Sequence, residues 1–208
     1  MSGFSQLKPD DAMVRRAQRM DPKALDILFR MFAPAVYTLT LRLTQSAAVA
    51  DDLTQETFVD ILRGLPGFRF NASLSTWVRR IAVSRCLMHM RSAWERKAIA
   101  LDAIAEPASA DIDHATRIEL GHDLAAALGE LAPNARVVVW LHDVEGYTHR
   151  EIAELMDKSV SFSKSCLSRA HQQLRDVLVS EEDGSPTSDN TSQADAPAVV
   201  PILQRCMQ

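Results

Sequence analysis

Apolar residues recur at intervals of three and four along most of this chain. Between residues 22 and 45 they fall on one face of a helix, at Leu25, Leu28, Phe29, Phe32, Val36, Leu39 and Leu43. This spacing is typical of an amphipathic helix with one buried stripe. No stretch alternates apolar and polar residues for long enough to predict a strand. The sequence therefore predicts an all-α fold.

Two more helices are predicted in the N-terminal half. The spacing favours one over 49–63, closed by Leu65-Pro66-Gly67, and another that begins near Ser73 and reaches about Lys97. The inward-facing candidates of this last helix are Trp77, Ile81, Val83 and Met88.

In the C-terminal half, helices are expected over 116–131 and from Pro133 to Gly146. A proline in the first turn loses no intrahelical hydrogen bond, so Pro133 marks a helix start.

The segment after Gly146 predicts a helix-turn-helix. Thr148 and Glu151 have the spacing of a capping box, which starts a short helix. After a turn, Ser161 or Ser163 is expected to cap a final helix that ends near Leu178. In a helix-turn-helix the second helix enters the major groove of DNA, although any polar helical hairpin has the same layout.

Charge is distributed unevenly. The chain has a formal net charge of −4, yet residues 1–97 carry +6. We expect residues 1–97 to form one domain, the Ala- and Asp-rich segment 98–115 a linker, and 116–179 a second domain. Residues 180–208 are acidic and poor in large apolar residues, so we expect a disordered tail.

The positive charge is concentrated in residues 68–97, which contain seven basic residues and one acidic residue. Aromatic residues interleave with these arginines, a mixture suited to single-stranded nucleic acid, where cations follow the backbone and apolar pockets take unstacked bases. Taken singly, the aromatics are expected in the core; the basic run as a whole favours DNA.

Asp52, Gln55 and Glu56 lie one turn apart on a single predicted helical face. An acidic and amide face can bind a basic protein surface, and the alternative is a merely solvated face.

No motif of an enzyme or cofactor site is found. The sequence lacks a phosphate-binding glycine loop, a nucleophile elbow and His-Glu-x-x-His. Cys86-x-x-His89 is half a metal site without further ligands at a recognisable spacing, so no metal is expected. We expect no catalytic residue and no cofactor.

The cellular setting is predicted from thiols and hydropathy. Three widely spaced cysteines, Cys86, Cys166 and Cys206, form no disulfide framework. No apolar run approaches the ~18 residues of a membrane span, and the N-terminus lacks a secretory signal. We therefore expect a cytoplasmic protein without membrane insertion.

Several motifs occur together in order: DDLTQETF, STWVRRIAVSR, L-x-x-L-x-P-x-x-R and EGYTHREIAELM. Over about 22–97 and 120–178 the chain resembles the extracytoplasmic-function class of bacterial sigma factors. The resemblance implies a subunit that brings core RNA polymerase to promoter DNA, both double-stranded and melted, and that has an anti-sigma factor as a partner. The first domain is then expected to recognise and melt the minus-10 element, and the second to recognise the minus-35 element.

The resemblance also implies roles for single residues. Asp52, Gln55 and Glu56 are expected to dock on the polymerase. The loop 70–73 matches the one that holds a flipped base. The resemblance together with the basic run gives the residues expected on minus-10 DNA: Phe70, Asn71, Ala72, Ser73, Trp77, Arg79, Arg80, Ser84 and Arg85. Those expected on minus-35 DNA are Arg150, Ser161, Lys164, Ser165, Ser168 and Arg169.

The final helix departs from the family pattern. Relatives commonly have Gly-Thr-Val-Lys/Arg-Ser-Arg where this chain has residues 161–166, and His171 stands where an Arg is frequent. Because each lost phosphate contact weakens binding, we expect weaker minus-35 binding or a different preferred sequence.

Two rival functions follow from the same residues. A stand-alone helix-turn-helix regulator would need neither the basic run 68–97 nor the Asp52 face. A helical interaction module, similar to an anti-sigma factor, is disfavoured by the basic run.

Overall fold

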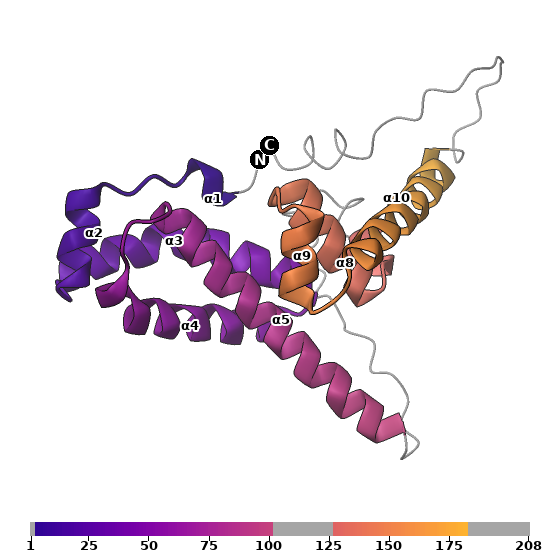
Figure 1. The fold of residues 1–208 in the computed structure, drawn as a ribbon, viewed down its shortest axis with the longest axis horizontal. Coiled ribbons are helices and arrows are strands. Elements are labelled where there is room, and N and C mark those ends of the chain that lie inside the picture. Colours follow the sequence, from indigo (N-terminus) through magenta and orange to yellow (C-terminus); the bar gives the residue numbers. More distant parts are fainter. Residues whose placement is uncertain (1–2, 102–126, 183–208) are drawn as a thin grey trace. The chain divides into compact units, whose positions relative to one another are not determined.

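The computed structural model describes residues 3–101 and 127–182, with side chains described for 3–92 and 127–176. Its contacts divide the chain into two units between Ile112 and Asp113. Within the described ranges every regular element is a helix and no strand is present, which confirms the all-α prediction (Figure 1). The predicted tail, apart from its first three residues, and most of the predicted linker lie outside the described residues.

The first unit is built on three long helices that pack against one another: α3 (Pro22–Thr44), α4 (Ala47–Gly64) and α5 (Leu74–Leu101). Two short helices precede them, α1 (Gly3–Gln6) and α2 (Asp11–Gln18), and the 3₁₀ turn η1 (Leu65–Gly67) follows α4. Figure 1 shows α5 running diagonally across the other helices of this unit. Its last four residues enter the segment predicted as linker.

Each long helix begins at a side chain that caps it. Asp21 accepts hydrogen bonds from the amides of Lys23 and Ala24, with Pro22 in the first turn of α3. Ser46 caps α4, and the Ser73 Oγ accepts from the Thr76 amide at the start of α5. The predicted start of α5 is therefore confirmed.

The predicted stripe of α3 is mostly buried, with Leu28, Phe32 and Val36 among its core residues. Phe29 is a correction, because 51% of it is exposed and its ring instead packs on Phe58 at a centroid distance of 4.6 Å. Met88 is a second, with 55% exposed. Each lies about 100° round its helix from an adjacent buried residue, outside the stripe.

By length and composition alone, α3 would suffice to cross a membrane. It packs on α2, α4 and α5, and a buried core helix passes the same test.

The second unit contains α8 (Pro133–Val139), a π-helical turn η2 (Trp140–Val144), α9 (His149–Met156) and α10 (Val160–Glu182). Residues 127–130 are also helical, while the rest of the predicted helix 116–131 lies outside the described residues except for Leu131. α10 packs on both α8 and α9.

The capping box at α9 is confirmed. The Glu151 amide donates to the Thr148 Oγ1 at 3.3 Å, and the Thr148 amide donates to the Glu151 Oε2 at 2.9 Å. The predicted caps of α10 are wrong, because the Phe162 amide donates to the Ser159 Oγ at 3.0 Å. Ser163 lies inside the helix, buried, with its hydroxyl against His149.

A buried carboxylate joins the elements of the second unit. The Asp143 side chain, 1% exposed, shares hydrogen bonds with His142 at 2.7 Å and with His171 of α10 at 2.6 Å. The His142 ring stacks on His149, whose Nδ1 lies 3.0 Å from the Ser163 Oγ. His171 therefore anchors α10 to η2.

Arg136 is the arginine of the L-x-x-L-x-P-x-x-R motif, and it is buried. Its guanidinium donates to three carbonyl oxygens that end the preceding helix, those of Leu128, Gly129 and Leu131, at 2.8–3.0 Å. Carbonyls at a helix end have no intrahelical donor, so this side chain satisfies them.

We predict that Arg136→Met destabilises the second unit by roughly 3 kcal/mol, because buried carbonyls lose a charged donor. The measurement is amide hydrogen exchange in α8 and α10 of the full-length chain under denaturant. Arg175→Met is the matched control, since Arg175 bonds the exposed Gln172 side chain. An Arg136→Met change within about 0.5 kcal/mol, as at ordinary surface sites, would contradict this role.

Candidate nucleic-acid interface

The loop 68–73 connects η1 to α5. Phe68 is buried, and its ring lies 4.9 Å from that of Phe70. Phe70 has φ of 57°, in the left-handed region that a bulky residue rarely adopts. Asn71, Ala72 and Ser73 are exposed. The loop therefore presents three short side chains beside two ordered aromatic rings.

A hollow of about 280 Å³, called hollow A, lies between this loop and α5. The residues that line it are Gly67, Phe68, Arg69, Asn71, Ala72, Thr76, Trp77 and Arg80. The Trp77 ring lies 5.3 Å from that of Phe68 and closely over Gly64, where a Cβ would stand 2.9 Å from the Trp77 Cζ2. Gly64 and Phe68 thus fix one wall of the hollow.

Hollow A brings together four of the predicted minus-10 residues: Asn71, Ala72, Trp77 and Arg80. An indole wall with guanidinium groups at the rim matches the needs of an unstacked base and its phosphate. Ser84 is exposed on α5 and lines none of the hollows described here.

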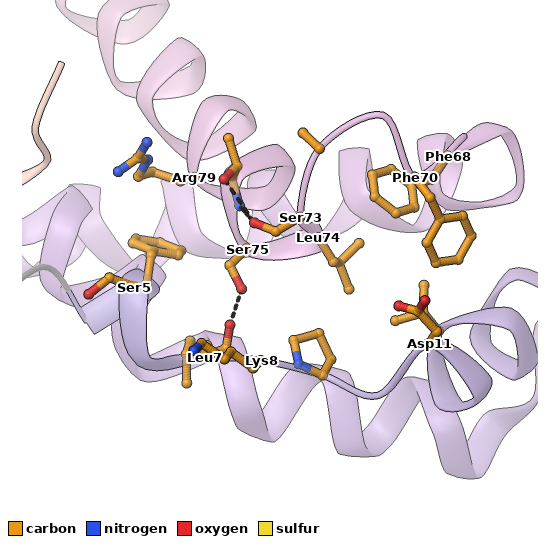
Figure 2. A pocket seen from close by; sticks show the side chains of 15 residues that line it. Ser5, Leu7, Lys8, Asp11, Phe68, Phe70, Ser73, Leu74, Ser75 and Arg79 are labelled. Atoms are coloured by element: carbon orange, nitrogen blue, oxygen red, sulfur yellow. Dashed lines mark hydrogen bonds between the residues drawn. The ribbon is translucent and has the colours of Figure 1, made fainter. Parts of the chain in front are cut away.

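A second hollow of about 480 Å³, called hollow B, lies against the N-terminal segment (Figure 2). It shares Ala72 with hollow A and adds the predicted residues Phe70, Ser73 and Arg79. Its other wall comes from residues 4–14, which lie outside every helix predicted from the sequence. The signal was present: Asp10 caps α2 by accepting from the Met13 amide, and Val14 and Ala17 fall at helical spacing.

The predicted docking residues Asp52, Gln55 and Glu56 are exposed and line a third hollow, called hollow C, of about 510 Å³ on α4. Arg85, predicted as a DNA contact, lies in this hollow instead of beside A or B.

The Arg85 guanidinium donates to the Asp60 carboxylate and lies 3.5 Å from the Glu56 Oε2. The hydrogen bond from Arg85 holds the pKa of Asp60 below its usual value. The guanidinium is thus engaged with α4 carboxylates, and its position favours a structural role.

The second unit exposes the polar face of its helix-turn-helix. All six predicted minus-35 residues are exposed: Arg150 on α9, and Ser161, Lys164, Ser165, Ser168 and Arg169 on α10. The opposite face is buried through Cys166, Leu167, Ala170 and Leu174. The Arg169 Nε donates to the Ser165 carbonyl at 3.2 Å, which directs the side chain back along the helix.

The cysteines described are packing residues. Burial raises the pKa of the Cys86 thiol to about 12, and burial also raises the pKa of Cys166. Both shifts disfavour the thiolate that binds metals and oxidises. Within the described residues, no cluster of three or more His, Cys, Asp or Glu side chains is arranged to hold a metal ion.

Comparison with known proteins gives two family matches in order along the chain. Residues 28–96 match Sigma-70 region 2, and residues 122–174 match Sigma-70 region 4. The first match contains every lining residue of hollows A and C, and the second contains α9 and most of α10.

Named relatives agree with these matches. The ECF RNA polymerase sigma factor SigE of Mycolicibacterium smegmatis is 35% identical over 162 residues, covering 74% of this chain and 61% of that protein. The RNA polymerase sigma-H factor of Pseudomonas aeruginosa is 28% identical, covering 81% of this chain and 93% of the relative.

A solved structure agrees in fold. The sigma factor RpoE of Bartonella quintana, in complex with the anti-sigma factor NepR, matches with a TM-score of 0.52 and 20% identity, over 76% of this chain and 98% of that one. From the paired region matches and these relatives, we conclude that this chain belongs to the extracytoplasmic-function class of bacterial sigma factors.

Proposed function

We propose that this sigma factor brings core RNA polymerase to promoters through three surfaces. The residues of hollow C bind the polymerase, hollow A binds melted minus-10 DNA, and the exposed face of α9 and α10 binds the minus-35 duplex. The observation that carries the proposal is hollow A, where an ordered loop, an indole ring and guanidinium groups meet.

In the first unit, the proposed task is to hold one flipped base. Extracting a base from duplex DNA costs a few kcal/mol, which a shaped pocket must offset. We assign the base to hollow A, between the loop and Trp77, with Arg80 on its phosphate. Ser84, further along α5, is assigned to the upstream edge of the opened segment.

In the second unit, α10 is proposed to enter the major groove of the minus-35 element. Lys164 and Arg169 have the reach to contact guanine edges or phosphates, and the neighbouring serines can donate to phosphate oxygens. Arg150 of α9 is assigned to the phosphate backbone of the DNA. Because His171 is engaged with Asp143, this face has fewer free cations than relatives with an arginine there.

Polymerase docking is assigned to Asp52, Gln55 and Glu56, whose oxygens suit a basic protein surface. We assign Arg85 to positioning these carboxylates, since it is engaged with Glu56 and Asp60. This replaces its predicted place on minus-10 DNA.

The division of labour follows the predicted domains. Residues 1–97 would act on polymerase and minus-10 DNA, residues 116–179 on minus-35 DNA, and 98–115 would tether them. Alone, each small unit offers few base contacts, so promoter binding by the free chain should be weak.

The family works as an initiation factor with polymerase, and we propose the same for this chain, in the cytoplasm and without catalysis of its own. The stand-alone regulator is not favoured, since the region 2 match spans residues 28–96. An anti-sigma partner is also proposed, supported by the similar Bartonella quintana RpoE, which was solved with one.

We predict that Asp52→Arg weakens binding to core polymerase by roughly tenfold or more, because it sets like charges against each other. Adding Glu56→Arg should abolish binding. The measurement is the affinity of the full-length chain for purified core enzyme. Asp26→Arg is the matched control, an exposed acid of α3 paired with Arg30 outside hollow C. Equal affinities for the two single variants would refute the docking assignment.

We also predict that Arg169→Ala impairs promoters that depend on their minus-35 element. One lost base or phosphate contact should weaken the polymerase–promoter complex roughly 5- to 150-fold. Run-off transcription on promoters with and without that element measures this loss, and Arg175→Ala on the same helix is the control. If minus-35-dependent promoters fire normally with Arg169→Ala, α10 does not read them through this residue.

A further inference from the structure

We propose that hollow B is a second nucleotide site, which takes an unstacked nucleotide of the melted strand adjacent to the base in hollow A. The inference rests on the proposed function, because it takes hollow A to hold the first flipped base.

The two hollows lie on either side of one short loop. Phe68, Ala72 and Thr76 line both of them, so the loop and the first turn of α5 form the wall between A and B. A strand that crosses this wall with one base in hollow A brings the neighbouring nucleotide to hollow B. Consecutive nucleotides of one strand are covalently joined, so occupation of A raises the local concentration at B.

The lining of hollow B has the chemistry of a nucleotide site. Figure 2 shows the rings of Phe68 and Phe70 at one end and Arg79 with Ser5 at the other. Lys8 adds a second cation, and Asp11 is the single acid among the fifteen lining residues. Aromatic rings suit a base, and cations with hydroxyls suit its phosphate.

The wall formed by the N-terminal segment is held in place. The Ser75 Oγ donates to the Leu7 carbonyl, as the dashed line in Figure 2 marks, and Phe4 is 2% exposed. The Gln18 Nε2 donates to the Phe68 carbonyl at 2.7 Å and to the Leu65 carbonyl at 3.2 Å.

A cation also braces the loop. The Arg15 guanidinium lies over the Phe70 ring, 4.8 Å from its centroid. The wall and the loop are therefore ordered in the free protein. A preformed pocket binds its ligand without a further ordering cost.

The test scans single abasic sites along the non-template strand of a pre-opened minus-10 segment. Binding of each DNA to the full-length chain on core polymerase is measured. We expect two adjacent positions at which loss of the base weakens binding, by roughly 5- to 100-fold each, the range of one base–aromatic contact.

Variants then assign the two positions. Lys8→Glu places a negative charge in hollow B, and Ser5→Trp fills it; both sites are exposed, so the fold should tolerate the changes. Each variant should reduce the loss of binding that an abasic site causes at the position assigned to hollow B, and should not change the loss at the position assigned to hollow A. Trp77→Ala should do the reverse. Lys23→Glu, an exposed lysine of α3 outside the hollows, is the charge-matched control and should change neither.

Each outcome has a fixed meaning. A single sensitive position overturns the second site and leaves the proposed function standing. Two positions that ignore both Lys8→Glu and Ser5→Trp also overturn it, because the second base then lies elsewhere. If no position is sensitive, hollow A does not hold a base, and the proposed function fails with it.

Discussion

The proposed recognition of a melted base depends on the order of one short loop, residues 68–73. Phe68, the first residue of the loop, is buried, and the Gln18 side chain donates a hydrogen bond to its carbonyl. Ser73 ends the loop by capping α5. Because both ends are fixed, the residues between them keep the shape that separates hollow A from hollow B. Recognition of an unstacked base requires such a shape before the base arrives.

The second unit follows the same logic with buried polar groups. Arg136 satisfies the carbonyls of one helix end, and Asp143 joins η2 to α10. Both side chains are largely removed from water, so their hydrogen bonds must be complete. Because these buried groups hold the unit together, the exposed residues on the outer face of α10 are not needed for packing, and this is the face proposed to bind DNA. His171 of the final helix likewise serves the fold, through its hydrogen bond with the buried Asp143.

Periodicity and caps predicted much of this fold. The helices α3, α4 and α5 follow from three-and-four spacing, and α9 from its capping box, because these signals are local. The predictions that were wrong concern which side chains are buried and which serine caps a helix. Phe29 has the spacing of a core residue, but its ring packs on Phe58 at the surface. Ser159 caps α10 in place of the predicted Ser161 or Ser163.

Among the site residues, Arg85 was predicted on minus-10 DNA, and the structure shows that its ion-pair partners Glu56 and Asp60 come from another helix. The N-terminal wall of hollow B was missed, although the spacing of Val14 and Ala17 indicates the helix α2. The packing of this wall could not be predicted in the same way, because contacts such as Ser75 with Leu7 join residues far apart in sequence.

The central claim is that two small helical units open DNA selectively only on the polymerase. The most direct measurement places a fluorescent base analogue, 2-aminopurine, in the minus-10 segment of a duplex promoter and follows its unstacking. With the full-length chain and core enzyme together, fluorescence should rise; with either alone it should stay at the duplex level. An equal rise with the chain alone, or no rise with both, would contradict the account.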